Sequence, residues 1–179
     1  KIVHLLRNKY DCIMSTSKSI NYDNSLLNCR IDGLNNNKPD LFIIDLNLNL
    51  KKNLNLKKLL NKRKTYLITL EKNYKKISNY KDIGYKLILI KSLENKEDLS
   101  KLYKKIYKIG YTRILVESGL TFLNFLIKNK MMNDLYIFQS KYNLGKNGKN
   151  NDTTANFKKN LTKQVTINLK SDKLFKKIF

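Results

Sequence analysis

The feature that most constrains the fold is the alternation along the chain between short apolar runs and stretches with helical spacing. Residues 41–45, Leu-Phe-Ile-Ile-Asp, form a continuous apolar run that ends in an acid, which is typical of a buried strand. Residues 92–108 instead repeat Leu99, Leu102 and Ile106 near helical spacing, which predicts a helix. Strands that alternate with helices predict an α/β fold built on a central sheet.

The same patterns locate the other elements. We expect further strands over residues 11–16, 65–69, 85–90, 111–117, 134–139 and 165–169. Helices are expected over residues 1–9 and 120–130, with a helical or looped segment over residues 18–30. Residues 34–40 are expected to be a loop, residues 46–56 an extended or irregular segment, and residues 143–160 a polar, mobile loop. Because the pattern contains no internal repeat and no sign of a second domain, residues 1–179 are expected to be one domain.

The charge of the chain allows a second class of function. The formal net charge is +23, from 37 Lys and Arg against 14 Asp and Glu, which fits a nucleic-acid-binding module. Composition offers a simpler account, because Lys, Asn, Ile and Tyr are abundant, whereas Ala and Pro occur once each and Trp is absent. This bias is typical of an AT-rich genome, and the lysines are spread along the whole chain. We therefore expect a solvated cationic surface and no nucleic-acid partner.

Two cysteines, Cys12 and Cys29, and the single His4 are too few for a disulfide framework or a Cys/His zinc site. We therefore expect reduced thiols and no metal. No apolar run reaches the roughly 18 residues of a membrane-spanning helix, and the first residues do not resemble a secretory signal. A cytoplasmic protein without a membrane partner is expected.

The most informative local pattern is the junction after the strand over residues 111–117. This strand ends at Glu117, turns through Gly119 and leads into the helix over residues 120–130. Ligands in open α/β sheets gather at the carboxyl ends of strands, and a helix N-terminus presents free N–H groups to phosphate. The pattern is compatible with a phosphate-binding turn, but on its own it favours an ordinary strand–turn–helix junction. No three-glycine dinucleotide fingerprint and no P-loop occurs.

Arginine is rare in this chain, occurring only at positions 7, 30, 63 and 113. Where codon bias favours Lys, a retained Arg suggests a site that needs a planar fork of donors. Arg7 and Arg30 flank the segment that contains Leu26, Leu27 and Asn28. We expect their guanidinium groups to converge on a substrate phosphate, the alternative being two ordinary surface arginines.

An ordered set of motifs resembles the reductase of riboflavin biosynthesis, 5-amino-6-(5-phosphoribosylamino)uracil reductase, which has a dihydrofolate-reductase-like fold. The resemblance covers roughly residues 3–148 and rests on the following residues in order: His4-Leu5-Leu6-Arg7, Asp11-Cys12-Ile13-Met14, Ser19, Asp23, Ser25, Leu26, Arg30, Pro39, Ile43-Ile44-Asp45, Val116-Glu117-Ser118-Gly119, Asp134-Leu135-Tyr136 and Leu144-Gly145.

The resemblance implies a mixed, mostly parallel sheet flanked by helices, and a set of site residues. Substrate-binding positions are Arg7, Leu27, Arg30 and Glu117, and Glu117 is also the candidate catalytic residue. Positions that contact the cofactor NADPH are Ser19, Asp23, Gly119, Leu120 and Thr121. The substrate would be a phosphoribosylaminopyrimidine, and the protein would be a homodimer.

The chain also departs from the family pattern. Asn24 and Ser25 stand where the family has an acid and a proline, and Leu46 stands where a small polar residue often faces the cofactor. The family's first strand is not found, and neither is the zinc deaminase domain that is commonly fused upstream. We therefore expect an N-terminally truncated reductase domain that is fused to or associated with a deaminase.

These features lead to one functional prediction and its alternatives. The chain is expected to be an oxidoreductase in which NADPH reduces the ribosyl group of 5-amino-6-(5-phosphoribosylamino)uracil to the ribitylamino product. The alternatives are a basic nucleic-acid-binding module and a related dihydrofolate-reductase-like reductase with another substrate.

Overall fold

A computed structural model describes residues 2–34, 39–142, 164–166, 169 and 172–179 of the chain. The chain divides into two compact units, Lys1–Ser118 and Gly119–Phe179.

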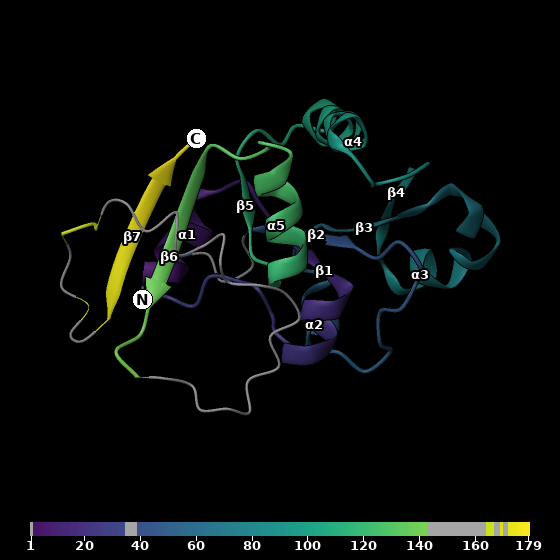
Figure 1. Cartoon of the computed structure of the whole chain (residues 1–179). Coiled ribbons are helices and arrows are strands. Elements are labelled where there is room, and N and C mark those ends of the chain that lie inside the picture. The colour runs from purple at the N-terminus through teal and green to yellow at the C-terminus, as the bar shows by residue number, and fades with distance from the viewer. Residues whose placement is uncertain (1, 35–38, 143–163, 167–168, 170–171) are drawn as a thin grey trace. The chain divides into compact units, whose positions relative to one another are not determined.

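The first unit is built on a five-stranded parallel sheet with the order β4-β3-β2-β1-β5, whose strands lie side by side in Figure 1. The strands are β1 (Cys12–Thr16), β2 (Asp40–Ile44), β3 (Thr65–Leu70), β4 (Lys86–Ile90) and β5 (Ile114–Val116). The chain steps outward from β1 to β4 and then returns to place β5 on the other side of β1. This return creates a point where the strand order reverses, which is where open α/β sheets bind their ligands.

The helix α1 (Ile2–Lys9) precedes β1, and the other helical segments connect the strands. They are α2 (Ser17–Asp23), the 3-10 helices η1 (Asn55–Leu59) and η2 (Glu71–Lys76), α3 (Ser78–Ile83) and α4 (Lys96–Lys108). The helix α4 begins at Lys96 because the side chain of Asn95 accepts the N–H of Asp98. Its apolar side buries the predicted residues Leu99, Leu102 and Ile106 completely.

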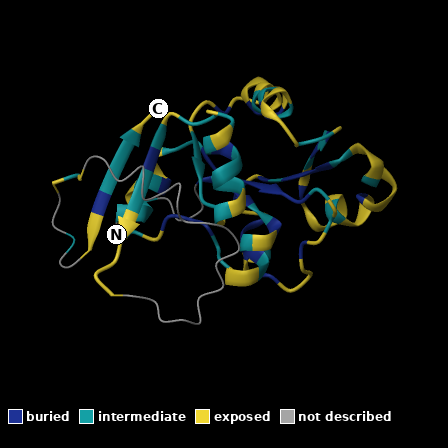
Figure 2. Ribbon diagram, viewed as in Figure 1, coloured by how far each residue is buried: buried dark blue, intermediate teal, exposed yellow. Residues whose placement is uncertain are grey.

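The core of the first unit lies along β1, β2 and β3, whose residues are mostly buried and dark blue in Figure 2. Ile13 on β1 is fully buried and pairs with Leu41 on β2 and with Leu115 on β5. Buried parallel strands carry apolar side chains on both faces, which explains the continuous apolar run over residues 41–44.

The second unit contains α5 (Leu120–Lys128) and an antiparallel pair of strands, β6 (Asp134–Gln139) and β7 (Lys173–Ile178). Asp134 pairs with Ile178 at one end and Gln139 with Lys173 at the other. The Nζ atom of Lys176 lies 3.1 Å from Oδ2 of Asp134, so an ion pair joins the two strands.

The predicted fold class is confirmed, and most elements lie where the sequence predicts them. The strand predicted over residues 165–169 is not found at its described residues, Val165, Thr166 and Leu169. Gln164 forms an isolated antiparallel bridge with Phe175, and the N–H of Val165 donates to the carbonyl of Leu174. Residues 173–178, which pair with β6, form the strand β7 instead. The strand predicted over residues 111–117 is shorter than expected, since the Asp11 carboxylate accepts the N–H groups of Thr112 and Arg113 before the ladder begins.

Two further expectations have different outcomes, and two helical segments were not expected. Residues 46–54 contain turns and no strand and lead into η1, which agrees with the irregular alternative. The segments η2 and α3 are not expected from the sequence. The mobile loop predicted over residues 143–160 lies outside the described residues.

Candidate functional site

The site is built around Glu117, the residue that directly follows β5. Val116 pairs with Met14 of β1, and the N–H of Glu117 donates to the carbonyl of Met14 at 3.0 Å. This bond extends the β1–β5 ladder by one residue and fixes the backbone of Glu117. The carboxylate therefore begins at the carboxyl end of a strand that borders the reversal in strand order.

Arg7 of α1 binds this carboxylate with a fork of two hydrogen bonds. Its Nε donates to Oε1 at 2.8 Å and its Nη2 donates to Oε2 at 2.7 Å. The two side chains are only 11% and 24% exposed, so the pair is largely removed from water. Parallel bonds between a guanidinium and a carboxylate are strong and fix the relative orientation of both groups.

The same guanidinium also fixes the segment Leu26–Arg30. Nη1 of Arg7 donates to the carbonyl of Asn28 at 3.0 Å. Arg7 thus joins α1, the end of β5 and this segment through a single side chain. The sequence predicts Arg7, Leu27, Arg30 and Glu117 in one substrate site, and in the structure Arg7 binds Glu117 directly and the Leu26–Arg30 segment through Asn28.

His4 lies one helical turn before Arg7 and holds the other end of the segment. Its Nδ1 accepts the backbone N–H of Arg30 at 3.1 Å and lies 3.2 Å from the carbonyl of Asn28. Burial, followed by the positive charge of Arg7, lowers the pKa of His4 below its usual value, and Arg30 acts in the same direction. The neutral imidazole is the form that can accept the N–H of Arg30.

Arg30 and Leu27 differ in their surroundings. Arg30 is exposed, and within the described residues its guanidinium has no ion-pair partner, so it is available for an anionic ligand. Leu27 is 6% exposed and has a φ of 49°, a left-handed conformation that a non-glycine residue rarely adopts.

The predicted cofactor residues Ser19 and Asp23 lie on α2. Ser19 forms part of the helix start, because its N–H donates to the Thr16 hydroxyl and its own hydroxyl lies 3.0 Å from that oxygen. Asp23 is exposed at the last position of the helix. The N–H and hydroxyl of Ser19 thus interact with Thr16 at the start of the helix, whereas Asp23 is exposed to solvent.

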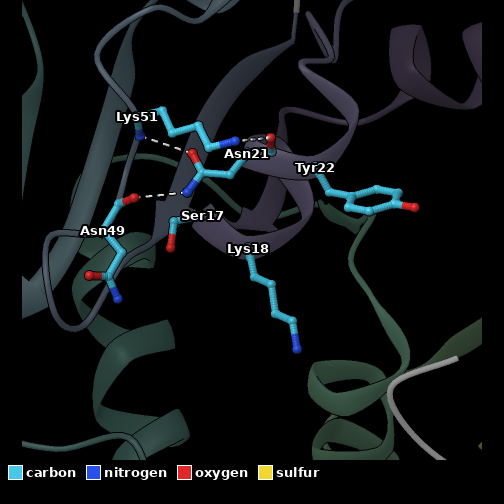
Figure 3. Close-up of a pocket in the computed structure, with 6 residues that line it drawn as sticks. All are labelled: Ser17, Lys18, Asn21, Tyr22, Asn49 and Lys51. Atoms are coloured by element: carbon cyan, nitrogen blue, oxygen red, sulfur yellow. Dashed lines mark hydrogen bonds between the residues drawn. The ribbon is translucent and has the colours of Figure 1, made fainter. Parts of the chain in front are cut away.

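An open cleft of about 350 Å³ runs beside α2 (Figure 3). We call it the α2 cleft, and its lining residues are Ser17, Lys18, Asn21, Tyr22, Asn49 and Lys51. Asn21 fixes the far wall, since its amide donates to the carbonyl of Asn49 and accepts the N–H of Lys51. The Lys51 ammonium group donates to the carbonyl of Asn21 at 3.4 Å, and the Lys18 ammonium group and the exposed ring of Tyr22 also line the cleft. These groups suit an anionic ligand with an aromatic part.

Asp45 positions residues that line the α2 cleft, although the sequence does not predict it as a site residue. Its carboxylate is buried and accepts the hydroxyl of Ser17 at 2.9 Å and the backbone N–H groups of Asn49 and Leu50 at 2.8 Å each. The signal that could have found it is an acid directly after a buried strand, at the carboxyl end where ligands gather.

The predicted residues Gly119, Leu120 and Thr121 belong to the second unit. Gly119 precedes α5 with a φ of −67° and a ψ of 167°, which any residue can adopt. A requirement for glycine here would therefore come from a ligand that approaches closely and not from the backbone itself. Thr121 is exposed in the first turn of the helix.

Comparisons with known proteins identify the family. The sequence model described as the RibD C-terminal domain matches residues 1–175. The chain belongs to this family. The resemblance predicted from the sequence motifs is thereby confirmed. No curated protein sequence matches the chain.

Solved structures of RibD proteins share the fold. RibD of Acinetobacter baumannii superposes with a TM-score of 0.74 at 16% identity, over 99% of this chain and 49% of that one. A deaminase/5-amino-6-(5-phosphoribosylamino)uracil reductase of Thermotoga maritima gives 0.69 at 18% identity, over 98% and 47%. The riboflavin biosynthesis reductase Rib7 of Saccharomyces cerevisiae gives 0.71 at 20% identity, over 98% and 77%. The chain thus spans about half the length of the bifunctional relatives.

Two further observations concern metals and membranes. Within the described residues, no group of His, Cys, Asp and Glu side chains could hold a metal ion. Among the helices that the structure describes, none is long and apolar enough to cross a membrane.

The position of His4 predicts a pH dependence that can be measured. An unfolded histidine titrates near pH 6.5, and the folded pKa is lower, so the unfolded chain binds the extra proton first. The His4 contribution to the free energy of unfolding should therefore be present above pH 6.5 and be lost as the pH falls through the folded pKa.

The variant His4→Asn provides the control, because an amide oxygen can accept the N–H of Arg30 without titrating in this range. We expect the free energy of unfolding, measured by urea titration between about pH 5 and 8, to fall more steeply toward acid in the unaltered protein. An NMR titration of this single histidine that gives a pKa at or above 6.5 would contradict the prediction.

Proposed function

We propose that the protein is a nicotinamide-dependent reductase of the riboflavin pathway that acts on 5-amino-6-(5-phosphoribosylamino)uracil. The observation that carries the proposal is the joining of Arg7, Glu117 and the Leu26–Arg30 segment, which are up to 110 positions apart in sequence, into one cluster. Family membership supports the reaction class, because the matched RibD-type relative from Thermotoga maritima is named as this reductase.

In this proposal, the substrate lies against the cluster, with Arg30 as its phosphate ligand. The guanidinium of Arg30 is exposed, while its backbone is held by His4. Arg7 is already engaged by Glu117 and Asn28, so it contributes mainly by fixing their positions and by adding positive charge. The Leu27 side chain packs in the core, so its proposed contribution is through the backbone of the segment. Glu117 accepts hydrogen bonds from the substrate and is the candidate for handling a proton.

NADPH is the proposed cofactor, and when bound it supplies the hydride that converts the ring-opened ribosyl group to the ribityl group. The α2 cleft fits part of a phosphorylated dinucleotide, because Lys18 and Lys51 provide cations and Tyr22 an exposed ring. Ser19 and Asp23 lie on the same helix, and the start of α5 with Gly119, Leu120 and Thr121 is proposed to contact the cofactor as well. A homodimer, a deaminase partner and a cytoplasmic location are also part of the proposal.

The first test of this function uses Arg30. The unaltered protein should oxidise NADPH in the presence of the phosphorylated pyrimidine. Arg30→Lys keeps the charge but loses the planar fork, and Arg30→Ala loses both. A charge-assisted hydrogen bond contributes about 1.5–3 kcal/mol, so Arg30→Ala should raise the substrate KM about tenfold or more, and Arg30→Lys by less.

The Kd of NADPH should stay within about twofold in both variants, since Arg30 is proposed to contact only the substrate. Absence of reductase activity in the unaltered protein would contradict the proposed function. An unchanged substrate KM in Arg30→Ala would be compatible with the reductase function but would contradict the contact between Arg30 and the phosphate. Oligonucleotide binding that survives physiological salt would favour the alternative nucleic-acid function.

A second test concerns cofactor choice at the α2 cleft. NADPH differs from NADH by a 2′-phosphate, which Lys18 or Lys51 can bind as a cation. Charge reversal by Lys18→Glu or Lys51→Glu replaces attraction by repulsion, so we expect the Kd of NADPH to rise about tenfold and that of NADH to change little. The Kd of each cofactor is measured for each variant by titration, with protein or cofactor fluorescence as the signal.

Lys104→Glu is the matched control, because Lys104 is exposed on α4 and its replacement makes the same change in net charge. If Lys104→Glu weakens NADPH as much as the cleft variants do, the effect is one of overall charge, and the cleft is not the phosphate site.

A further inference from the structure

Arg63 is a buried arginine that the proposed function leaves without a role. It lies between η1 and β3 and is only 6% exposed. Its Nη1 donates to the carbonyl of Leu27 at 2.7 Å and to that of Pro39 at 3.0 Å, and its Nη2 donates to the carbonyl of Leu26. A single guanidinium therefore binds two consecutive carbonyls at the start of the Leu26–Arg30 segment.

Holding carbonyls does not by itself require a charged residue. Burial lowers the pKa of Arg63 to about 10, which reflects the cost of removing its charge from water. Within the described residues no ion pair joins Arg63 to a carboxylate, and the nearby Asp40 instead accepts the N–H of Lys64 and the hydroxyl of Tyr111. The chain thus accepts a buried charge in order to hold a backbone segment with a rigid fork of donors.

The segment that Arg63 holds is strained. Leu27 has a φ of 49°, in the left-handed region that costs free energy for a residue with a Cβ atom. Strained backbone persists only where the surroundings impose it, and it is concentrated at functional sites. Here Arg63 binds the carbonyls of Leu26 and Leu27, Arg7 binds that of Asn28, and His4 accepts the N–H of Arg30.

We propose that Arg63 is a positioning residue for substrate binding, which imposes the left-handed conformation of Leu27 and so directs the exposed Arg30 toward the phosphorylated pyrimidine, while the Leu27 side chain packs in the core. The inference rests on the proposed reductase function. Arg63 itself does not touch the substrate, because its side chain is buried beneath the segment and donates to backbone carbonyls.

The test compares Arg63→Lys with Arg113→Lys. An ammonium group at position 63 can reach fewer carbonyls, so the segment should lose its fixed conformation and the substrate KM should rise about tenfold, which corresponds to about 1.4 kcal/mol. The Kd of NADPH should change less than about twofold. Arg113 is the control because its guanidinium binds Asp11 at the start of β1, away from the segment, so its replacement should leave the substrate KM unchanged.

A second measurement does not depend on catalysis. Hydrogen exchange at the amides of residues 27–30 should accelerate in Arg63→Lys more than exchange at the amides of β1, and Arg113→Lys should not show this local effect. If Arg63→Lys does not fold, Arg63→Met replaces it, because that change removes the buried charge together with the donors.

The outcomes separate the inference from the function on which it rests. A raised substrate KM with faster local exchange supports the positioning role. If the unaltered enzyme is active and the Arg63 variant has an unchanged substrate KM, the inference is overturned and the reductase function stands. The same holds if hydrogen exchange in the variant accelerates uniformly. An unaltered protein without reductase activity overturns the proposed function, and the inference fails with it.

Discussion

The ion pair between Arg7 and Glu117 is the interaction on which the proposed substrate site depends. It joins a helix at the start of the chain to the end of β5, across 110 positions of sequence, with both carboxylate oxygens accepting from one guanidinium. A largely buried pair is costly to form, and it is stable because its geometry is good and a third N–H of the guanidinium is used by the carbonyl of Asn28. The role of Arg7 is therefore to fix other groups, and the exposed Arg30 is left for the ligand.

Two buried charges without catalytic roles shape the first unit in the same manner. Asp45 binds the Ser17 hydroxyl and the backbone N–H groups of Asn49 and Leu50, and so sets the wall of the α2 cleft. Arg63 binds the carbonyls of Leu26 and Leu27 and so sets the start of the substrate segment. In both cases a buried ionisable side chain forms the hydrogen bonds with backbone groups that would otherwise be formed within a helix or sheet.

The sequence predicted the parallel strands well, because buried strands are continuous apolar runs. The sequence did not predict β7, because Lys173, Lys176 and Lys177 make this segment polar. The strand forms through its pairing with β6. Residues 165–169 have the better strand composition, but local propensity yields to tertiary pairing. The contact of Arg7 with Glu117 had no local signal, so only the family resemblance placed both residues in one site. Arg63 carried one signal, its rarity in a lysine-rich chain, and its partners are backbone carbonyls that no sequence pattern reveals.

A double-mutant cycle between Arg7 and Glu117 tests the central claim most directly. The free energy of unfolding is measured by urea titration for the unaltered protein, Arg7→Met, Glu117→Gln and the double variant, and the cycle cancels the separate loss of the Asn28 contact. A largely buried bidentate pair predicts a coupling energy of about 2 kcal/mol or more, with each single change destabilising by about 2–4 kcal/mol. A coupling energy below about 0.5 kcal/mol, the value of an exposed pair, would contradict the account.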